Sequence, residues 1–580
     1  MPLPGKTAPL RFAVMCNGTV FQRWQADALK ELKDQGHNLV LLIVDAREVT
    51  AASRVKRLLK KKWSTILFTF LDNRIFKPAA KDAVDLQQEL TGIEMLECLV
   101  QKRGYSEYFR DEEIESIRRC RPDFILRFGF NILRGDILTA ARFGVWSFHH
   151  DDEMSYRGGP PGFWEIFRGD PVNGAILQRL TEKLDGGIIL KKGYLKTLFH
   201  SYRENIHQLL SVSASWPAQM ANEMSRNLTG SEGMVVLPAM PASATSAPLY
   251  KIPGNLQMLK FLLLLIRNRL RFYYYEMLAA EIWNVGLIIK PLHEVALGTR
   301  IIGKDDVTWL PVVAHTGYLA DPAGFHADGR LHLLAEDYSY ARQKAGISEI
   351  IVEIAPGDIP SPGMFGNPVS IMDGGTHRSY PYVFEHQGRV YCLPESYQSS
   401  QITLFRREDP GGRFVKERVI LDGVRAVDPT LFFYNGWWWL FFTERKYSNT
   451  HLYLYHSKNL TGEFAAHPLN PVKTDIRSAR PAGTPFVHEN VLYRPAQDCS
   501  ATYGGRVAIN RVLRLTPGEY YEETVRFIEP VKGSPYDKGL HTLSAVGNVT
   551  LVDGKKYQLN RLFFSLQLRK KLTRKDRGNV

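Results

Sequence analysis

The sequence predicts two domains of different class: an α/β domain in the first half and an all-β, five-bladed propeller in the second. Two observations lead to this prediction. Strand and helix patterns alternate from residue 10 to residue 235, which is typical of a largely parallel sheet covered by helices. After residue 290 the chain is dominated by strand patterns, and a hairpin-like unit recurs five times. A chain of 580 residues is also too long for one compact domain.

The first strand–helix–strand unit begins close to the N-terminus. Residues 10–15 form an apolar run of strand length, and residues 38–44 (NLVLLIV) form a second. Between them, residues 21–32 place apolar side chains at helical spacing, and Gly36 suits the end of a helix. Residues 124–126 predict a further strand. The first turn lacks a GxGxxG sequence, so the residues do not predict a dinucleotide site there.

The domain boundaries follow from changes in composition. We place the α/β domain at residues 10–235 and a linker with a helix at residues 236–289. The propeller follows at residues 290–558, and a basic tail occupies residues 559–580. Residues 256–278 (LQMLKFLLLLIRNRLRFYYYEML) predict a cationic, apolar helix. Two interpretations of this helix stay open: a connector that packs against both domains, or a helix that lies on an anionic membrane surface.

The five repeats each consist of a strand, a tight turn and a second strand. They start about 50 residues apart. Their first residues are Asp321, Tyr380, Asp428, Arg480 and His541. Each of these is polar and stands at the start of an inner strand, and the inner strands of a propeller surround its central funnel. We therefore expect the five side chains to meet around one cavity.

The composition excludes several classes of protein. With 44% hydrophobic and 23% charged residues, the chain is not disordered. A net charge of +14 permits an anionic partner without indicating nucleic acid. The five cysteines form no CxxC pair, so we expect neither a zinc ribbon nor a disulfide scaffold, and we assign no metal ligands. Their odd number fits a reducing compartment. No signal peptide or membrane span is visible, and we expect a cytoplasmic protein, with peripheral contact with the inner face of the membrane as an open alternative.

Residues 144–158 (GVWSFHHDDEMSYRG) resemble the signature of the formyltransferase family, which includes methionyl-tRNA formyltransferase and the sugar N-formyltransferases. That signature has an Asn two residues before a His, then a Tyr or Trp followed by Arg-Gly. His149 and Arg157 keep the family spacing of eight residues. Residues 184–187 (LDGG) look like a later family element, and the resemblance covers roughly residues 10–200.

The resemblance implies transfer of a formyl group from 10-formyltetrahydrofolate to an amine through a tetrahedral oxyanion. It implies His149 as the base and oxyanion partner, and Asp185 as the carboxylate that orients it. It also implies substrate-binding roles for Arg157 and Gly158. Asp151 begins an acidic run that is unusual for the family. We expect it either to bind a substrate ammonium group or to belong to a solvated loop.

One residue departs from the family pattern. Ser147 stands where the family carries the Asn that donates a hydrogen bond to the formyl oxygen. Loss of one oxyanion donor typically costs on the order of 3 kcal/mol. We therefore expect one of three outcomes: a slow reaction, a reaction rebuilt with another donor such as His150 or Asn131, or a lost activity.

The second half, over about residues 290–555, resembles the five-bladed propeller at the N-terminus of plant glucosamine inositolphosphorylceramide transferase and, more distantly, the five-bladed glycoside hydrolases. Segments that carry the resemblance include 427–432 (VDPTLF) and 477–483 (RSARPAG). In the hydrolases, carboxylates from separate blades act as acid and base. The candidate carboxylates and ligand-binding residues here are Asp321, Tyr380, Glu395, Asp428, Arg480, Arg494, Asp498 and His541. The alternative is that several of them only join neighbouring blades.

Three functions remain open. The first is a formyltransferase that acts on an amine, most plausibly an amino sugar of a surface glycan or its precursor, with a propeller that binds the glycan. The second is a propeller-based glycoside hydrolase with a formyltransferase-like domain that has no activity. The third is a glycan-binding or assembly protein. No nucleic-acid partner is expected, because the basic excess is modest and the second half does not resemble the small barrel of the tRNA enzyme.

Overall fold

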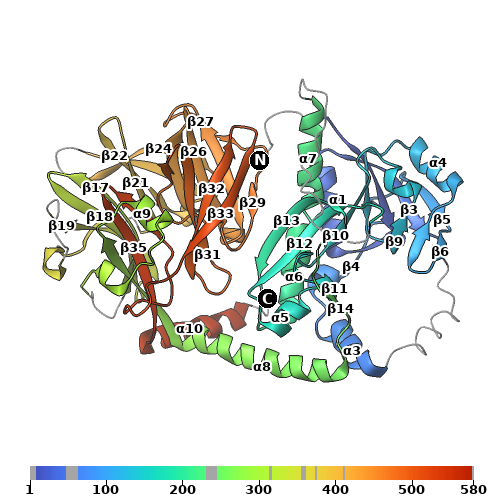
Figure 1. The fold of residues 1–580 in the computed structure, drawn as a ribbon, viewed down its shortest axis with the longest axis horizontal. Coiled ribbons are helices and arrows are strands. Elements are labelled where there is room, and N and C mark those ends of the chain that lie inside the picture. The colour runs from blue at the N-terminus through green and yellow to red at the C-terminus, as the bar shows by residue number, and fades with distance from the viewer. Residues whose placement is uncertain are drawn as a thin grey trace. The chain divides into compact units, whose positions relative to one another are not determined.

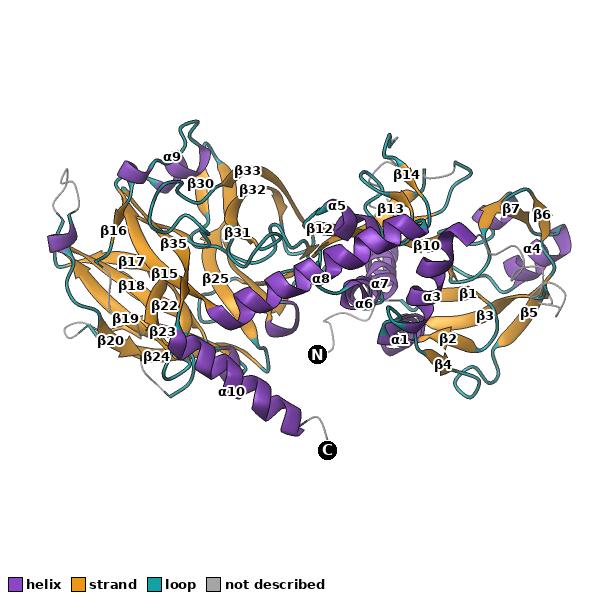
Figure 2. Ribbon diagram, turned by 90° about the horizontal axis from the view of Figure 1, so that it is seen from below, coloured by secondary structure: helices purple, strands orange, loops and turns teal. Residues whose placement is uncertain are grey.

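The computed structural model describes residues 8–47, 63–183, 186–229, 245–311, 317–354, 361–372, 375–408 and 412–577 (Figure 1). Its contacts divide the chain into two units, with the boundary between Arg269 and Leu270. The first unit is an α/β domain and the second is built almost entirely from strands (Figure 2). The predicted fold class, an α/β domain followed by an all-β propeller, is confirmed.

A seven-stranded sheet forms the centre of the first unit. In spatial order its strands are β13 (Ile188–Lys196), β12 (Val172–Arg179), β10 (Val145–His149), β8 (Phe124–Arg127), β1 (Arg11–Cys16), β3 (Asn38–Asp45) and β5 (Glu94–Cys98). The five strands from β10 to β5 run parallel, whereas β12 and β13 are antiparallel additions. β1 is buried on both faces, which explains its continuous apolar run.

Up to residue 229, the described α-helices of this unit are α1 (Arg23–Asp34), α3 (Ile66–Arg74), α4 (Asp111–Arg119), α5 (Phe163–Arg168), α6 (Tyr202–Ser213) and α7 (Trp216–Thr229). Of these, α1, α4, α6 and α7 pack against strands of the sheet, as the alternating sequence pattern predicts. α1 buries Trp24, Leu29 and Leu32, which lie on one side of the helix. α8 (Asn255–Leu278) follows, in agreement with the predicted helix, and packs Phe261 against Phe163 and Tyr202.

The strand order places the C-terminal ends of β1, β8 and β10 side by side. After β1 the chain moves to β3 on one side of it, and it later returns to form β8 on the other side. Ligands of open α/β sheets bind at the point where the order reverses, beyond the carboxyl ends of the strands. The fold therefore directs attention to the segments that follow Cys16, Arg127 and His149.

The second unit contains five antiparallel sheets, one for each predicted repeat. The first three blades are β17 (Gly317–Ala327) to β20 (Val369–Met372), β21 (Ser379–His386) to β24 (Phe414–Asp422), and β25 (Ala426–Tyr434) to β28 (Ala465–Ala466) with β29 (Lys473–Thr474). The fourth runs from β30 (Phe486–His488) through β31 (Val491–Asp498) and β32 (Arg506–Leu515) to β33 (Tyr520–Ile528). The fifth joins β34 (Leu543–Val546) and β35 (Val549–Leu559) to β15 (Ala279–Ile288) and β16 (Thr308–Trp309).

The propeller begins earlier than its predicted start at residue 290. β15 pairs with β35 along ten residues, so a strand from the N-terminal side of the propeller completes the last blade. The sequence repeat does not reveal this strand, because β15 has no hairpin partner next to it in the chain. The predicted linker, residues 236–289, thus contains a central strand of the closing blade. The predicted basic tail, residues 559–580, includes α10 (Arg561–Arg577).

The repeats share two local conformations. Four hairpins turn through consecutive residues with positive φ, such as Asn435 and Gly436, which is the type I′ turn. In the first three blades the first residue of the repeat, Asp321, Tyr380 or Asp428, also has positive φ, and the strand pairing shifts register there. Left-handed backbone is strained for these residue types, so neighbouring contacts must hold it in place.

The role of β15 can be tested by truncation. A fragment of residues 270–580 should unfold cooperatively, whereas a fragment of residues 290–580 should be insoluble or lack a cooperative transition, because it leaves the β35 edge unpaired. Thermal unfolding followed by circular dichroism distinguishes the two fragments. Equal stability of both would show that β15 is not needed to close the propeller.

Candidate active site

His149 is the last residue of β10 and lines a cavity of about 170 Å³ at the carboxyl ends of the parallel strands. The cavity walls combine the apolar Ile132, Leu133 and Leu180 with the polar Arg127, Asn131 and Lys183. Such a mixture of apolar walls with a few polar groups is typical of sites for small organic ligands. The segment predicted as a signature therefore lies at a cavity that suits it.

Ser147 lies two residues before His149 on β10 and is buried, 1% exposed. Its Oγ accepts hydrogen bonds from Arg127 Nε at 3.1 Å and Nη2 at 2.9 Å. Its own hydroxyl donates to the Phe148 carbonyl at 3.4 Å. The prediction that Ser147 takes the donor role of the family's Asn is therefore corrected: Ser147 holds the Arg127 guanidinium, and its single proton is directed elsewhere.

Arg127 is the last residue of β8 and lines the same cavity as His149. Its Nη1 donates to the Phe130 carbonyl at 3.3 Å and the Asn131 carbonyl at 2.6 Å. Phe130 has φ of 63°, so the turn after β8 adopts a strained backbone that presents these carbonyls to Arg127. A guanidinium has five N–H groups. Among the described residues, four of them have acceptors, and one Nη2–H remains for a ligand.

The two substitute donors considered from the sequence are committed elsewhere. His150 Nε2 lies 3.0 Å from Ser213 Oγ, and the His150 ring stacks on Phe148. Burial, with smaller effects of His149 and Lys81, lowers the pKa of His150 to about 3. Asn131 donates from both its backbone and side-chain nitrogens to Glu107, at 2.7 Å and 2.6 Å. The sequence did not identify Arg127, which carries no signal apart from its place at a strand end.

The other predicted residues of this domain have mixed outcomes. Asp185 lies outside the described residues. Asp151 is buried and accepts a hydrogen bond from the Gly162 amide, and burial raises its pKa to about 8. A buried neutral carboxyl does not suit an ammonium ligand, so that expectation is corrected, as is the alternative of a solvated loop. Gly158 has a structural reason to be glycine, because a Cβ there would lie 2.2 Å from the Tyr250 carbonyl. Arg157 precedes it in β11 (Arg157–Gly158).

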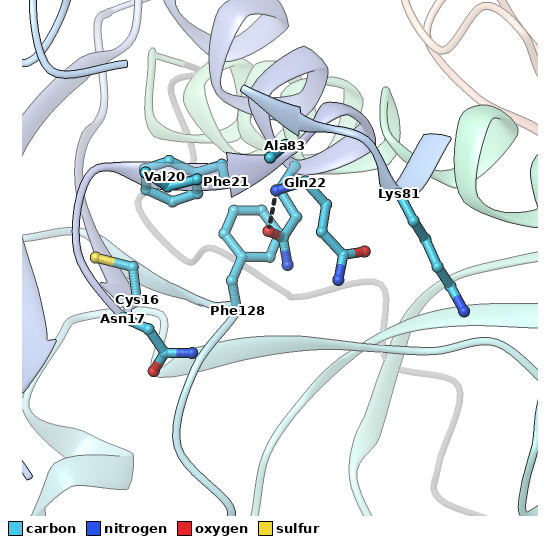
Figure 3. A pocket seen from close by; sticks show the side chains of 9 residues that line it. Cys16, Asn17, Val20, Phe21, Gln22, Lys81, Ala83 and Phe128 are labelled. Carbon is cyan, nitrogen blue, oxygen red and sulfur yellow. Dashed lines mark hydrogen bonds between the residues drawn. The ribbon is translucent and has the colours of Figure 1, made fainter. Parts of the chain in front are cut away.

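A second cavity, of about 220 Å³, opens beyond the end of β1 (Figure 3). Asn17, Gln22, Lys81 and Phe128 contribute to its walls. Phe128 lines this cavity, and the preceding Arg127 lines the one at His149, so consecutive residues at the end of β8 contribute to the two cavities.

In the propeller, four of the five repeat-initial residues form two pairs, Asp428 with Arg480 and Asp321 with His541. Asp428 accepts from Arg480 Nε at 2.5 Å and from Gln497 at 2.7 Å. His541 lies 3.4 Å from Asp321 and 2.5 Å from Asp553. The fifth, Tyr380, is buried beside them, and its hydroxyl bonds Thr430 and the Gly483 amide of another blade.

The carboxyl groups beside the repeat-initial residues form hydrogen bonds with one another and with the backbone. Glu395 accepts a hydrogen bond from the Asp428 amide at 3.0 Å and shares a side-chain hydrogen bond with Asp428. Burial and the neighbouring Asp428 raise the pKa of Glu395 well above its ordinary range. Glu336 has the equivalent place on β18 (Arg330–Ser339) and pairs with Asp321. Burial and the neighbouring Asp321 raise the pKa of Glu336 well above its ordinary range. These contacts hold the strained repeat-initial residues in place.

Two predicted ligand-binding residues of the propeller are structural, and their assignment is corrected. Arg494 is buried and donates to Glu522 and to the carbonyls of Ser478 and Ala479, which satisfies its guanidinium inside the protein. Asp498 accepts from the Ser500 amide and from Arg506, so it fixes the turn after β31.

Asp321, His541 and Asp553 are close enough to suggest a cation site, since one ligand atom of each lies within 4.8 Å of the others. Both ring nitrogens of His541 face these carboxylates. Burial alone would lower the pKa of His541, but Asp553 and Asp321 outweigh that effect and raise it.

The raised pKa of Glu395 generates a prediction. A group whose pKa is raised by folding stabilises the protein below its unfolded pKa of about 4.3, and that stabilisation is lost as the pH rises through the folded value. Glu395→Gln keeps an acceptor for the Asp428 amide and a donor for its carboxylate. Its free energy of unfolding should therefore fall less than that of the wild type as the pH rises.

The matched variant Glu395→Ala leaves the Asp428 amide without its acceptor and should destabilise the protein by about 1–3 kcal/mol at neutral pH. Urea unfolding of the three proteins across the pH range gives both results. A steeper loss of stability with pH in Glu395→Gln than in the wild type would contradict the assignment.

Comparison with known proteins assigns a relative to each half. A family model described as glucosamine inositolphosphorylceramide transferase 1, N-terminal, matches residues 361–543, which lie in the propeller. Glucosamine inositolphosphorylceramide transferase 1 of Oryza sativa subsp. japonica is 35% identical over 168 residues, 28% of this chain and 22% of that protein. Methionyl-tRNA formyltransferase of Chlorobium limicola is 37% identical over 70 residues, 12% of this chain and 22% of that protein.

Among solved structures, the catalytic domain of a Coprinopsis cinerea family GH62 α-L-arabinofuranosidase is 14% identical, with a TM-score of 0.31, and the match covers 49% of this chain and 99% of that one. The chain spans about a fifth of the length of each of the two curated relatives, both of which are transferases by name. The chain is therefore a fusion of a formyltransferase-like α/β domain with a five-bladed propeller that resembles the N-terminal domain of glucosamine inositolphosphorylceramide transferase 1.

Proposed function

We propose that the chain is a formyltransferase that moves a formyl group from 10-formyltetrahydrofolate to the amine of an amino sugar in a surface glycan or its precursor. The observation that carries this proposal is the placement of His149 and Arg127 on one cavity at the carboxyl ends of β8 and β10. A base and a cationic donor beside a partly apolar cavity are what acyl transfer to an amine requires.

The cavity suits one end of the donor. Its volume of about 170 Å³ is below the ~300–1,000 Å³ typical of pockets for whole ligands, so it would take the ring end of a folate and leave the tail outside. Ile132, Leu133 and Leu180 would cover the faces of the ring. Lys183 and Arg134 also line the cavity and would suit the carboxylates of the tail. The donor supplies an activated formyl group, and the chain supplies the base and the hydrogen-bond donor.

In this proposal His149 accepts the proton that the attacking amine loses as the new C–N bond forms. The remaining Nη2–H of Arg127 donates to the formyl oxygen as negative charge develops on it. The protonated His149 then gives its proton to N10 of the folate as the bond from the formyl carbon to N10 breaks, so that tetrahydrofolate and the formylated amine are released. Ser147 and the carbonyls of Phe130 and Asn131 fix the guanidinium before the substrate arrives. A donor that is already oriented needs no reorganisation during the reaction, which is why such groups stabilise transition states effectively. Arg127 thus replaces the family's amide.

The acceptor would enter from the second cavity, beyond β1. This cavity is lined by the polar Asn17, Gln22 and Lys81, which suit a hydroxyl-rich sugar, and by Phe128, which follows Arg127 in the chain. The propeller would bind the rest of the glycan. Its similarity to the N-terminal domain of a transferase whose name specifies glucosamine supports an amino-sugar acceptor. Folate donors are cytoplasmic metabolites, so we place the reaction in the cytoplasm.

Removal of the base tests this function. His149→Ala should reduce kcat for formyl transfer to amino sugars by about 10²–10⁴-fold. His207→Ala, an exposed histidine of α6 in the same domain, is the matched control and should retain activity. Transfer is followed with the labelled formyl group of the donor. A His149→Ala protein with wild-type kcat would exclude this mechanism and favour the propeller as the active unit.

The role of Arg127 is tested by exchanging the donor. Arg127→Leu should lower kcat by about 10²–10³-fold, the usual cost of one oxyanion donor. Adding Ser147→Asn in that background places an amide where the family has one, and part of the lost rate should return. Donor binding and thermal unfolding show that both proteins are folded. Full activity in Arg127→Leu would assign Arg127 a structural role only.

A further inference from the structure

Helix α8 carries two apolar faces, and only one of them is used by the fold. Its inner face buries Met258 and Phe261, and the Phe261 ring lies 4.1 Å from that of Phe163. This face fits the interpretation of α8 as a packed connector. The outer face requires a separate explanation.

The outer face is a stripe of exposed aliphatic side chains, which we call the leucine stripe. It consists of Leu256, Leu259, Leu263 and Ile266, and Leu270 continues it. They are spaced three or four residues apart, so they lie along one side of the helix. Leu256 is 83% exposed, Leu263 69% and Ile266 58%. A continuous row of exposed leucines on one helix is unusual for a protein surface and marks an interaction site.

The charges beside the stripe are all positive. α8 carries Lys260, Arg267, Arg269 and Arg271, and its sequence from Asn255 to Tyr275 contains no Asp or Glu. Lys260, Arg267 and Arg271 fall along the side of the helix that adjoins the stripe. This combination of an aliphatic face with flanking cations is complementary to a bilayer surface that carries anionic headgroups.

Aromatic side chains stand at both ends of the helix. Trp63, which is 82% exposed, lies at the start, where its carbonyl accepts a hydrogen bond from the Asn255 side chain. Tyr273, Tyr274 and Tyr275 lie near the other end and are also exposed. Trp and Tyr favour the headgroup region of a bilayer, because their rings are apolar with a polar edge.

We infer that α8 docks the protein on an anionic membrane, with the leucine stripe in the headgroup–acyl boundary and the cations at the headgroups. Among the described residues, no helix has the length and apolar character needed to cross a bilayer. α8 therefore lies in the plane of the surface. This inference does not depend on the proposed function, although it would place the transferase next to a membrane-bound acceptor.

Vesicle flotation with the full chain tests the docking. The wild type should bind vesicles of phosphatidylcholine mixed with phosphatidylglycerol, and binding to phosphatidylcholine alone should be at least about tenfold weaker. Leu259→Ser/Leu263→Ser/Ile266→Ser should reduce binding by at least about tenfold. Because the three side chains are exposed, thermal unfolding of this variant should match the wild type.

Charge controls separate local from overall electrostatics. Lys260→Gln/Arg267→Gln/Arg271→Gln should weaken binding to the anionic vesicles and flatten its salt dependence. Lys304→Gln/Lys416→Gln/Lys532→Gln removes the same charge from exposed positions elsewhere and should bind as the wild type does. Binding that both triple variants reduce equally would overturn the inference. The inference would also be overturned if the wild type did not bind vesicles and instead formed a dimer through the leucine stripe. Sedimentation of the wild type and of the serine variant shows whether such a dimer forms.

Discussion

The hydrogen bonds between Arg127 and Ser147 are the interactions on which the candidate chemistry depends. They bring a guanidinium, supplied by the neighbouring strand β8, to the point on β10 where the formyltransferase signature has an amide. The strained turn at Phe130 supports the same side chain from its other end. The serine that stands in the place of the family's amide is therefore accompanied by a charged guanidinium from an adjacent strand.

The propeller uses its charged residues differently. Asp321, Asp428, Arg480 and His541 converge on the funnel, but their strongest contacts are with one another and with the backbone of adjacent blades. Burial and neighbouring carboxylates raise the pKa values of Glu336 and Glu395 well above their ordinary range. This network holds left-handed residues at the inner strand ends.

Periodic and local features were predictable from the sequence, and long-range partners were not. The hairpin repeat predicted the five blades, and helical spacing predicted α8, because both depend on residues close together in the chain. β15 was assigned to a linker, because its partner β35 lies more than 250 residues away. Likewise, the signature located His149 and Ser147, but nothing near Arg127 showed that it would reach Ser147, 20 residues later. Arg494 and Asp498 were chosen for their chemistry, and only their partners showed that they are structural.

Calorimetry with a stable 10-formyltetrahydrofolate analogue tests most directly whether the cavity at His149 binds the formyl donor. We expect saturable binding to the wild type. Ile132→Trp, which fills the cavity from its wall, should abolish binding, whereas Ile301→Trp, at an exposed position in the other unit, should leave it unchanged. A wild type that does not bind the analogue, or an Ile132→Trp variant that binds it as tightly as the wild type does, would contradict a donor site at His149.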